Sequence, residues 1–146
     1  MRAKPKIRRV QLQISQNNES VLLGIVSAEP HYRLSLVLNK ELKISLKNSS
    51  PVTITTGTGD EMTFSRFSDS SESHNLEYDL TSNRSGKNHL VRKLKNIDYF
   101  FRIHDPDNEI NIDQAVSALR ESECITAVFN IDPDSLKDKN LFHLIH

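Results

Sequence analysis

Two alternating apolar runs flank a polar turn in residues 75–103, NLEYDLTSNRSGKNHLVRKLKNIDYFFRI. The apolar residues on one face of the first run are Leu76, Tyr78 and Leu80, and those of the second are Ile97, Tyr99, Phe101 and Ile103. Period-two alternation predicts two strands at the centre of a β-sheet, with Tyr99 as interior scaffolding. A Tyr99 phenol that lines an open cavity beside several ionisable groups would contradict this interpretation.

The chain has 146 residues and one cysteine. A domain of this length buries about two-thirds of the surface that its unfolded chain exposes. Cys124 has no partner for an internal disulfide and lies in the apolar run 124–131, so we expect a core cysteine and a reducing, cytoplasmic compartment. No segment reaches the length of a membrane span, and we expect no membrane partner.

Sequence patterns outside the central pair predict a mixture of helices and strands. The expected elements are a disordered tail at 1–6, a strand at 7–14, a short helix from Asn18 to Ala28, a helix from Pro30 to Glu41, a strand at 42–46, a turn at 48–51, strands at 52–56 and 62–67, and a loop at 68–73. Residues 34–38 also alternate, but we favour the helix there. The succession of strands suggests an antiparallel meander.

The last third of the chain predicts a strand, a helix and a strand, followed by a short helical segment that starts near Asp132. Asn111 is placed to cap a helix at 111–121, with Gln114 three residues later. In the strand at 124–131, the residues on one face are Ile125, Ala127, Phe129 and Ile131. The crossover is long enough for a parallel pair with the strand at 97–104. We therefore predict one α+β domain over 1–146, a largely antiparallel sheet packed by two or three helices, with a C-terminal strand-helix-strand unit.

Motifs for metals, nucleotides and catalysis are incomplete. Asp105, Asp107, Glu109 and Asp113 resemble the start of a calcium loop, but Ile110 and Val116 stand where its glycine and its bidentate glutamate belong. His143 and His146 have helical spacing without further zinc ligands. The Gly57-x-Gly59 turn lacks the third glycine of a dinucleotide site. We therefore expect no cofactor and no metal, and we assign no catalytic residue.

A ligand-binding groove is predicted where Asn83 and Arg84 meet Asp98 and Tyr99, because arginine offers a planar fork for a carboxylate or phosphate. An ion pair between Arg84 and Asp98 that only stabilises the loop explains the same residues.

Two other functions remain open. The basic segment from Arg84 to Lys95 could bind nucleic acid, with Phe100 as the aromatic residue free to stack on bases. Alternatively, an enzyme could use His104 as a base beside the acidic loop that starts at Asp105, although adjacent residues of a strand point to opposite faces.

Residues 80–85 and 90–103 resemble the bacterial IPExxxVDY family, which is named for a short signature. The signature covers residues 91–99, in which Asp98 and Tyr99 are identical and Val91 and Ile97 are conservative replacements. Arg92 and Lys93 stand where the family has proline and glutamate. Residues 31–34, 38–39 and 131–133 are also similar to the family. The resemblance implies a small cytoplasmic α+β protein and carries over no catalytic residue.

A complete sheet-and-helix pattern without a catalytic motif favours a non-enzymatic binding or assembly domain. Its partner is expected to be another protein or a second copy of the chain, bound through an exposed apolar sheet face or an unpaired edge.

Overall fold

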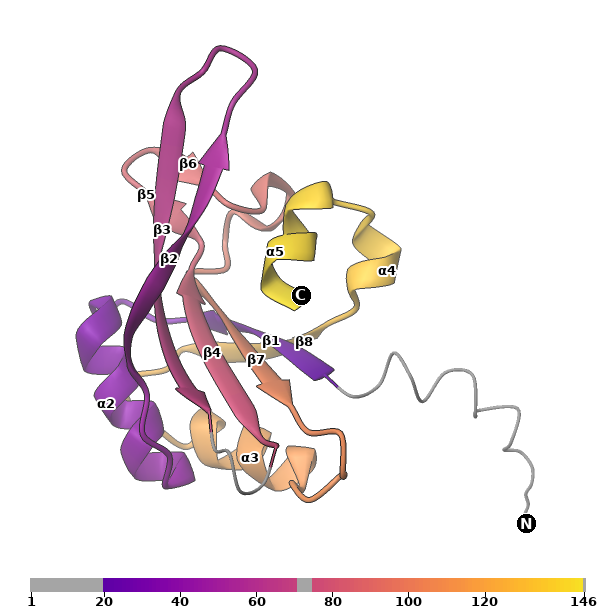
Figure 1. Ribbon diagram of the computed structural model, residues 1–146. Helices are drawn as coiled ribbons and strands as arrows, with labels where there is room; N and C mark the ends of the chain where they lie inside the picture. Colours follow the sequence, from indigo (N-terminus) through magenta and orange to yellow (C-terminus); the bar gives the residue numbers. More distant parts are fainter. Residues whose placement is uncertain (1–19, 71–74, 146) are drawn as a thin grey trace.

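One six-stranded antiparallel sheet organises the protein (Figure 1). The computed structural model describes residues 20–70 and 75–145. The strands follow the spatial order β2-β3-β4-β7-β1-β8. They are β1 (Ser20–Val26), β2 (Lys47–Thr55), β3 (Glu61–Ser70), β4 (Glu77–Ser82), β7 (Tyr99–His104) and β8 (Ala127–Ile131). The predicted tail at 1–6 and the strand at 7–14 lie outside the described residues.

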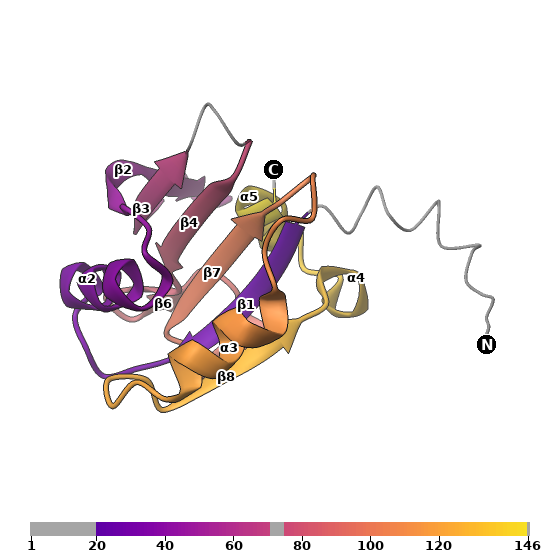
Figure 2. The ribbon, with the colours of Figure 1, turned by 90° about the horizontal axis from the view of Figure 1, so that it is seen from below.

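Helices cover both faces of the sheet (Figures 1 and 2). The helices α2 (His31–Leu42) and α3 (Ile112–Arg120) lie on one face. The opposite face carries the C-terminal turns α4 (Pro133–Leu136), η2 (Lys139–Leu141) and α5 (Phe142–Ile145). A small hairpin of β5 (Arg84–Ser85) and β6 (Asn88–His89), followed by the turn η1 (Arg92–Leu94), connects β4 to β7. Among the described residues, no helix is long and apolar enough to cross a membrane. The α+β prediction is confirmed.

The strands β4 and β7 occupy the centre of the sheet, as the alternating pattern predicts. They pair antiparallel, with Leu80 opposite Phe101. The rings of Tyr78 and Phe101 stack with centroids 6.0 Å apart. These side chains join Leu34, Leu38 and Leu119 of the two helices in one buried cluster. The hydrophobic periodicity therefore identifies this core face of both strands, but it is wrong at Ile97, which precedes β7 and lies in the other buried cluster.

A second buried cluster fills part of the other face. Its members include the fully buried Phe64 and Phe100 and, from the C-terminal turns, Leu141 and Leu144. A sheet that is buried on both faces has strands without a clear alternation of polar and apolar residues.

The helix predicted between Asn18 and Ala28 is wrong, because residues 20–26 form β1. This strand lies between β7 and β8, and Leu22 and Leu23 are buried on opposite faces. A continuous apolar run has no periodicity that distinguishes a buried strand from a helix.

The boundaries after α2 also differ from the prediction. The helix at 30–41 is confirmed and continues through Leu42, while Lys43 ends it in the left-handed conformation with φ 57°. Residues 43–46 are therefore not a strand. Nor is the segment 48–51 a turn, because β2 runs through it with a register shift between Ser49 and Val52.

The predicted parallel pair is also corrected. The strands β7 and β8 each pair antiparallel with β1, which lies between them. Helix α3 therefore joins two parallel strands that are not neighbours. The inward face predicted for β8 is wrong at Phe129, which is 46% exposed, while Val128 is buried. Cys124 is partly exposed.

Candidate functional site

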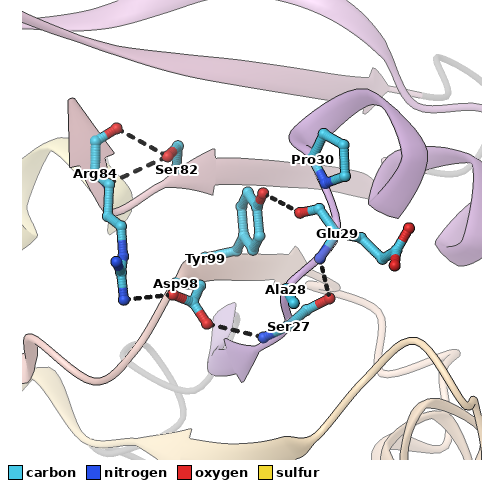
Figure 3. Close-up of a pocket in the computed structure, with 8 residues that line it drawn as sticks. All are labelled: Ser27, Ala28, Glu29, Pro30, Ser82, Arg84, Asp98 and Tyr99. Carbon is cyan, nitrogen blue, oxygen red and sulfur yellow. Dashed lines mark hydrogen bonds and ion pairs between the residues drawn. The ribbon is translucent and has the colours of Figure 1, made fainter. Parts of the chain in front are cut away.

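An open pocket of about 320 Å³ lies where the loop 27–30 after β1 faces the starts of β5 and β7 (Figure 3). The loop forms one wall, and Ser82, Arg84, Asp98 and Tyr99 form the other. Three of the four predicted site residues therefore meet in one pocket. Its volume is at the lower end of the ~300–1,000 Å³ that is typical of small-molecule sites.

Asp98 connects the two walls of the pocket. Its Oδ1 lies 2.7 Å from Nη2 of Arg84, and its Oδ2 accepts a hydrogen bond of 2.9 Å from the backbone N–H of Ser27. Its own N–H donates to the carbonyl of Ile25. The carboxylate is 16% exposed. The predicted ion pair between Arg84 and Asp98 is therefore present, and Asp98 holds the loop against β7.

Tyr99 belongs to both the core and the pocket. Its ring packs in the first buried cluster, and the residue is 8% exposed. Its hydroxyl donates a hydrogen bond of 2.6 Å to the carbonyl of Glu29 (Figure 3). Burial raises the pKa of Tyr99, and the negative charge of Asp98 adds to this rise, while Arg84 opposes it. The phenol lines an open pocket beside ionisable groups, so the interpretation of Tyr99 as scaffolding alone is wrong.

Arg84 is the most exposed charged group that the sequence predicts for this site. Its side chain is 54% exposed and starts from the short hairpin strand β5. The backbone N–H of Arg84 donates to Ser82 Oγ, and this hydroxyl donates to the carbonyl of Arg84. Among the described residues, the guanidinium forms an ion pair with Asp98 and no other hydrogen bond or ion pair. The remaining N–H groups of Arg84 are therefore available to a ligand.

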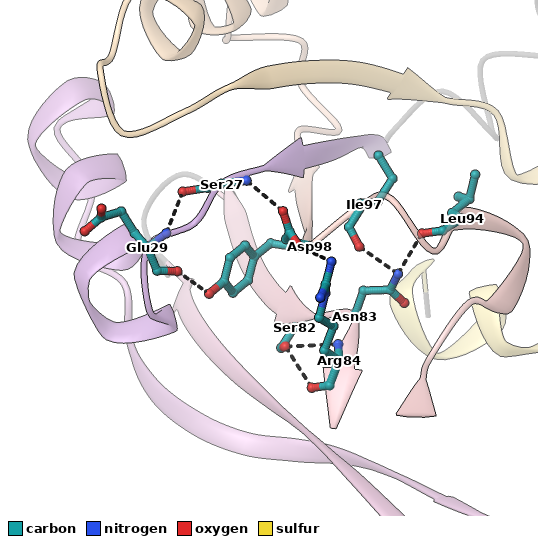
Figure 4. A network of polar contacts seen from close by, with 9 residues as sticks. Ser27, Glu29, Ser82, Asn83, Arg84, Leu94, Ile97 and Asp98 are labelled. Carbon is teal, nitrogen blue, oxygen red and sulfur yellow. Dashed lines mark hydrogen bonds and ion pairs between the residues drawn. The ribbon is translucent and has the colours of Figure 1, made fainter. Parts of the chain in front are cut away.

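Asn83 lies behind the pocket and does not line it (Figure 4). The residue is fully buried. Its Nδ2 donates to the carbonyls of Leu94 and Ile97, both at 2.9 Å, and its Oδ1 accepts from the N–H of Val91 at 2.8 Å. Its backbone N–H donates to the carbonyl of Asp98. Asn83 is therefore a positioning residue that fixes the loop between β4 and β7.

His31 supports the pocket from the first turn of α2. Its ring centroid lies 4.5 Å from that of Phe67 and 5.1 Å from that of Tyr99. Nε2 is 2.9 Å from the carbonyl of Leu80, and Nδ1 is hydrogen-bonded to Ser65 Oγ. Burial lowers the pKa of His31 to about 4, although the contact with the Leu80 carbonyl opposes this shift. The neutral ring therefore holds the helix against β3, β4 and β7.

The loop 27–30 and His31 are the parts of the site that the sequence did not identify. Residues 28–30 were expected only to end one helix and start the next. A Glu-Pro pair before a helix gives no signal that a distant strand will face it.

The aromatic part of the nucleic-acid hypothesis is wrong. Phe100 is 1% exposed and lies in the second buried cluster, so it is not free to stack on bases. Lys93 donates from Nζ to the carbonyl of Leu136 and ties the basic segment to the C-terminal turns. Lys87, Arg92 and Lys95 are exposed.

His104 and Asp105, which the enzyme hypothesis used for acid–base chemistry, form hydrogen bonds within the fold. His104 Nδ1 lies 2.9 Å from Ser20 Oγ. The Asp105 carboxylate is buried and accepts from the backbone N–H groups of Glu109 and Ile110, which closes the turn before α3. Within the described ranges, no three His, Cys, Asp or Glu side chains are grouped to hold a metal ion. His146 lies outside the described residues.

No family model matches the chain, and no curated protein matches it significantly.

Proposed function

We propose that this protein is a non-enzymatic binding domain and that the pocket between loop 27–30 and Arg84 is its ligand site. The observation that carries the proposal is the arrangement of Arg84. Asp98 fixes this guanidinium at 2.7 Å, yet the side chain stays 54% exposed at the pocket. An oriented guanidinium loses little freedom when it binds an oxygen acceptor.

The ligand class follows from the charge and the walls of the pocket. Asp98 neutralises Arg84, so charge alone gives a free inorganic anion little affinity, and a ligand also needs apolar contact with the pocket. Ala28 and Pro30 supply apolar surface opposite Arg84 (Figure 3). We therefore expect a small organic molecule that presents a carboxylate or amide oxygen to Arg84 and an apolar part to the loop.

Binding fits the contacts of this pocket better than bond-breaking chemistry. The raised pKa keeps the Tyr99 phenol protonated near neutral pH, and its proton is donated to the Glu29 carbonyl. The hydroxyl of Ser27 donates to the carbonyl of Cys124 at 2.6 Å. Neither hydroxyl has a base as its acceptor, and an activated nucleophile needs one.

The experiment is a titration followed by backbone amide NMR. The probes are benzoate, benzamide and N-acetylalanine, with inorganic phosphate as a comparison. We expect the organic probes to shift the amide signals of Ser27, Ala28 and Glu29. An Arg84→Gln variant should lose at least tenfold in affinity, whereas the matched control Lys87→Gln, changed in the same hairpin, should bind as the wild type does.

Two outcomes would overturn the proposal. One is that no organic probe shifts the three amide signals at millimolar concentration. The other is that Arg84→Gln binds a probe as tightly as Lys87→Gln does.

The family and the location are part of the same proposal. The matching positions Val91 and Ile97 are buried, and Asp98 and Tyr99 line the pocket. The departing positions 92 and 93 are exposed. This distribution supports membership of the IPExxxVDY family. The single cysteine supports a cytoplasmic location, which fractionation of the native cells would test.

A further inference from the structure

The two edges of the sheet differ in how they are protected. At one edge, β2 contains Lys47, Pro51 and a register shift, which are devices that discourage pairing with another strand. At the other edge, β8 has the sequence AVFNI, with no charge and no proline. This strand is a short, uncharged edge beside β1 (Figure 2).

Phe129 makes the β8 edge apolar as well as unpaired. It is 46% exposed and lies opposite Gly24 of β1 in the register. Gly24 has no side chain to cover the ring, and Ile97 and Ile131 fill the space above Gly24. The phenyl ring therefore stays open to solvent.

The backbone of β8 shows which groups point outward. The carbonyl of Val128 accepts a hydrogen bond of 2.9 Å from Nη2 of Arg120, an exposed side chain of α3. An arginine at this carbonyl indicates that it faces away from β1. Because backbone groups alternate along a strand, the N–H and C=O of Val128 and Asn130 face outward, whereas those of Phe129 face β1.

We propose that β8 pairs antiparallel with β8 of a second copy around a two-fold axis at Phe129. Phe129 then faces Phe129 of the second copy in a non-hydrogen-bonded pair, and Val128 forms a hydrogen-bonded pair with Asn130 of that copy. The two sheets join into one continuous sheet. Self-pairing of this kind is isologous, so each contact occurs twice.

The distribution of charge favours a second copy of the chain as the partner of β8. In this register, the paired β8 strands carry no charged residue, so no like charges face each other across the strands. Arg120 sits beside Val128, where Asn130 of the second copy arrives. The guanidinium can turn from the Val128 carbonyl to the side-chain amide oxygen of that Asn130. The edge is short, so its contact falls below the ~1,200–2,000 Å² of a standard interface, and we expect a weak dimer.

Site-specific cross-linking tests both the edge and the register. In a Cys124→Ser background, Phe129→Cys should form a disulfide-linked dimer under mild oxidation, because non-hydrogen-bonded pairs bring two Cα atoms to about 4.5 Å. The matched control is Thr53→Cys, an exposed position on the opposite edge strand, and it should cross-link at least tenfold more slowly.

Sedimentation velocity over a concentration series provides the second readout. The wild type should form more dimer as its concentration rises, and Phe129→Lys should remain monomeric at the highest concentration. The proposal requires both results. A wild type that is monomeric at millimolar concentration would overturn it, as would a dimer that Phe129→Lys leaves unchanged. Equal cross-linking of the two cysteine variants also counts against it. None of these outcomes depends on the pocket.

Discussion

Replacement of Asn83 by alanine tests the link between the buried loop and the pocket. The substitution removes three side-chain hydrogen bonds and leaves the carbonyl of Ile97 and the N–H of Val91 without a partner, whereas the carbonyl of Leu94 keeps its hydrogen bond from the N–H of Ile97. A buried polar group that loses its partner costs about 1–3 kcal/mol. Because these two groups will gain some water, we expect a total loss of about 2–4 kcal/mol in the free energy of unfolding.

Urea denaturation measures this loss. With a slope of about 2 kcal/mol per molar urea, the midpoint should fall by about 1–2 M. The matched control is Asn96→Ala, an exposed asparagine of the same connecting segment, whose midpoint should stay within about 0.3 M of the wild type because surface substitutions change stability little.

A second readout covers the case in which Asn83→Ala is only partly folded. Hydrogen exchange of the Val91 amide should become faster than exchange in the β4–β7 pair, because the loop loses its anchor before the sheet does. An Asn83→Ala variant within 1 kcal/mol of the wild type, with a protected Val91 amide, would show that the loop does not depend on this side chain.

The pocket and the sheet give three further expectations. In the unfolded chain His31 has its ordinary pKa of about 6.5, whereas in the folded protein burial lowers this pKa to about 4. The free energy of unfolding should therefore decrease by about 2 kcal/mol, allowing for partial exposure, as the pH drops from about 6.5 to about 4. His31→Phe should flatten this part of the pH profile. Tyr99→Phe should cost about 1 kcal/mol in thermal unfolding, because the hydrogen bond to the Glu29 carbonyl is lost; an unchanged melting temperature counts against that bond. Gly24→Ala brings Cβ to 2.9 Å from Cδ1 of Ile97 and should cost about 1–3 kcal/mol; a stabilised variant would show that this contact relaxes freely.

Alternation in the sequence predicts the strands whose two faces differ. Tyr78, Leu80 and Phe101 follow this pattern, and β4 and β7 occupy the predicted centre of the sheet. The pattern fails for β1, where Leu22 and Leu23 are both buried because each face of the sheet has its own cluster. The second face of β1 is covered by C-terminal turns that lie more than 100 residues later in the chain. No local sequence pattern contains that information.

The candidate site was predicted in part. Arg84 follows the end of β4 and Asp98 precedes the start of β7, and these two strands pair with each other. The two opposite charges are therefore expected to lie close together, so their ion pair could be predicted. The opposite wall could not, because the position of residues 27–30 depends on the placement of β1 beside β7. Asn83 was assigned to the ligand, but its amide is buried in the connecting loop, where it satisfies three backbone groups.

A crystallographic screen with small carboxylates and amides tests the central claim most directly, because it shows where a ligand binds without assuming its identity. The account predicts electron density in the pocket between Pro30 and Arg84, with a ligand oxygen at 2.7–3.1 Å from a guanidinium nitrogen. Fragments that bind repeatedly elsewhere on the protein while this pocket holds only solvent would contradict it.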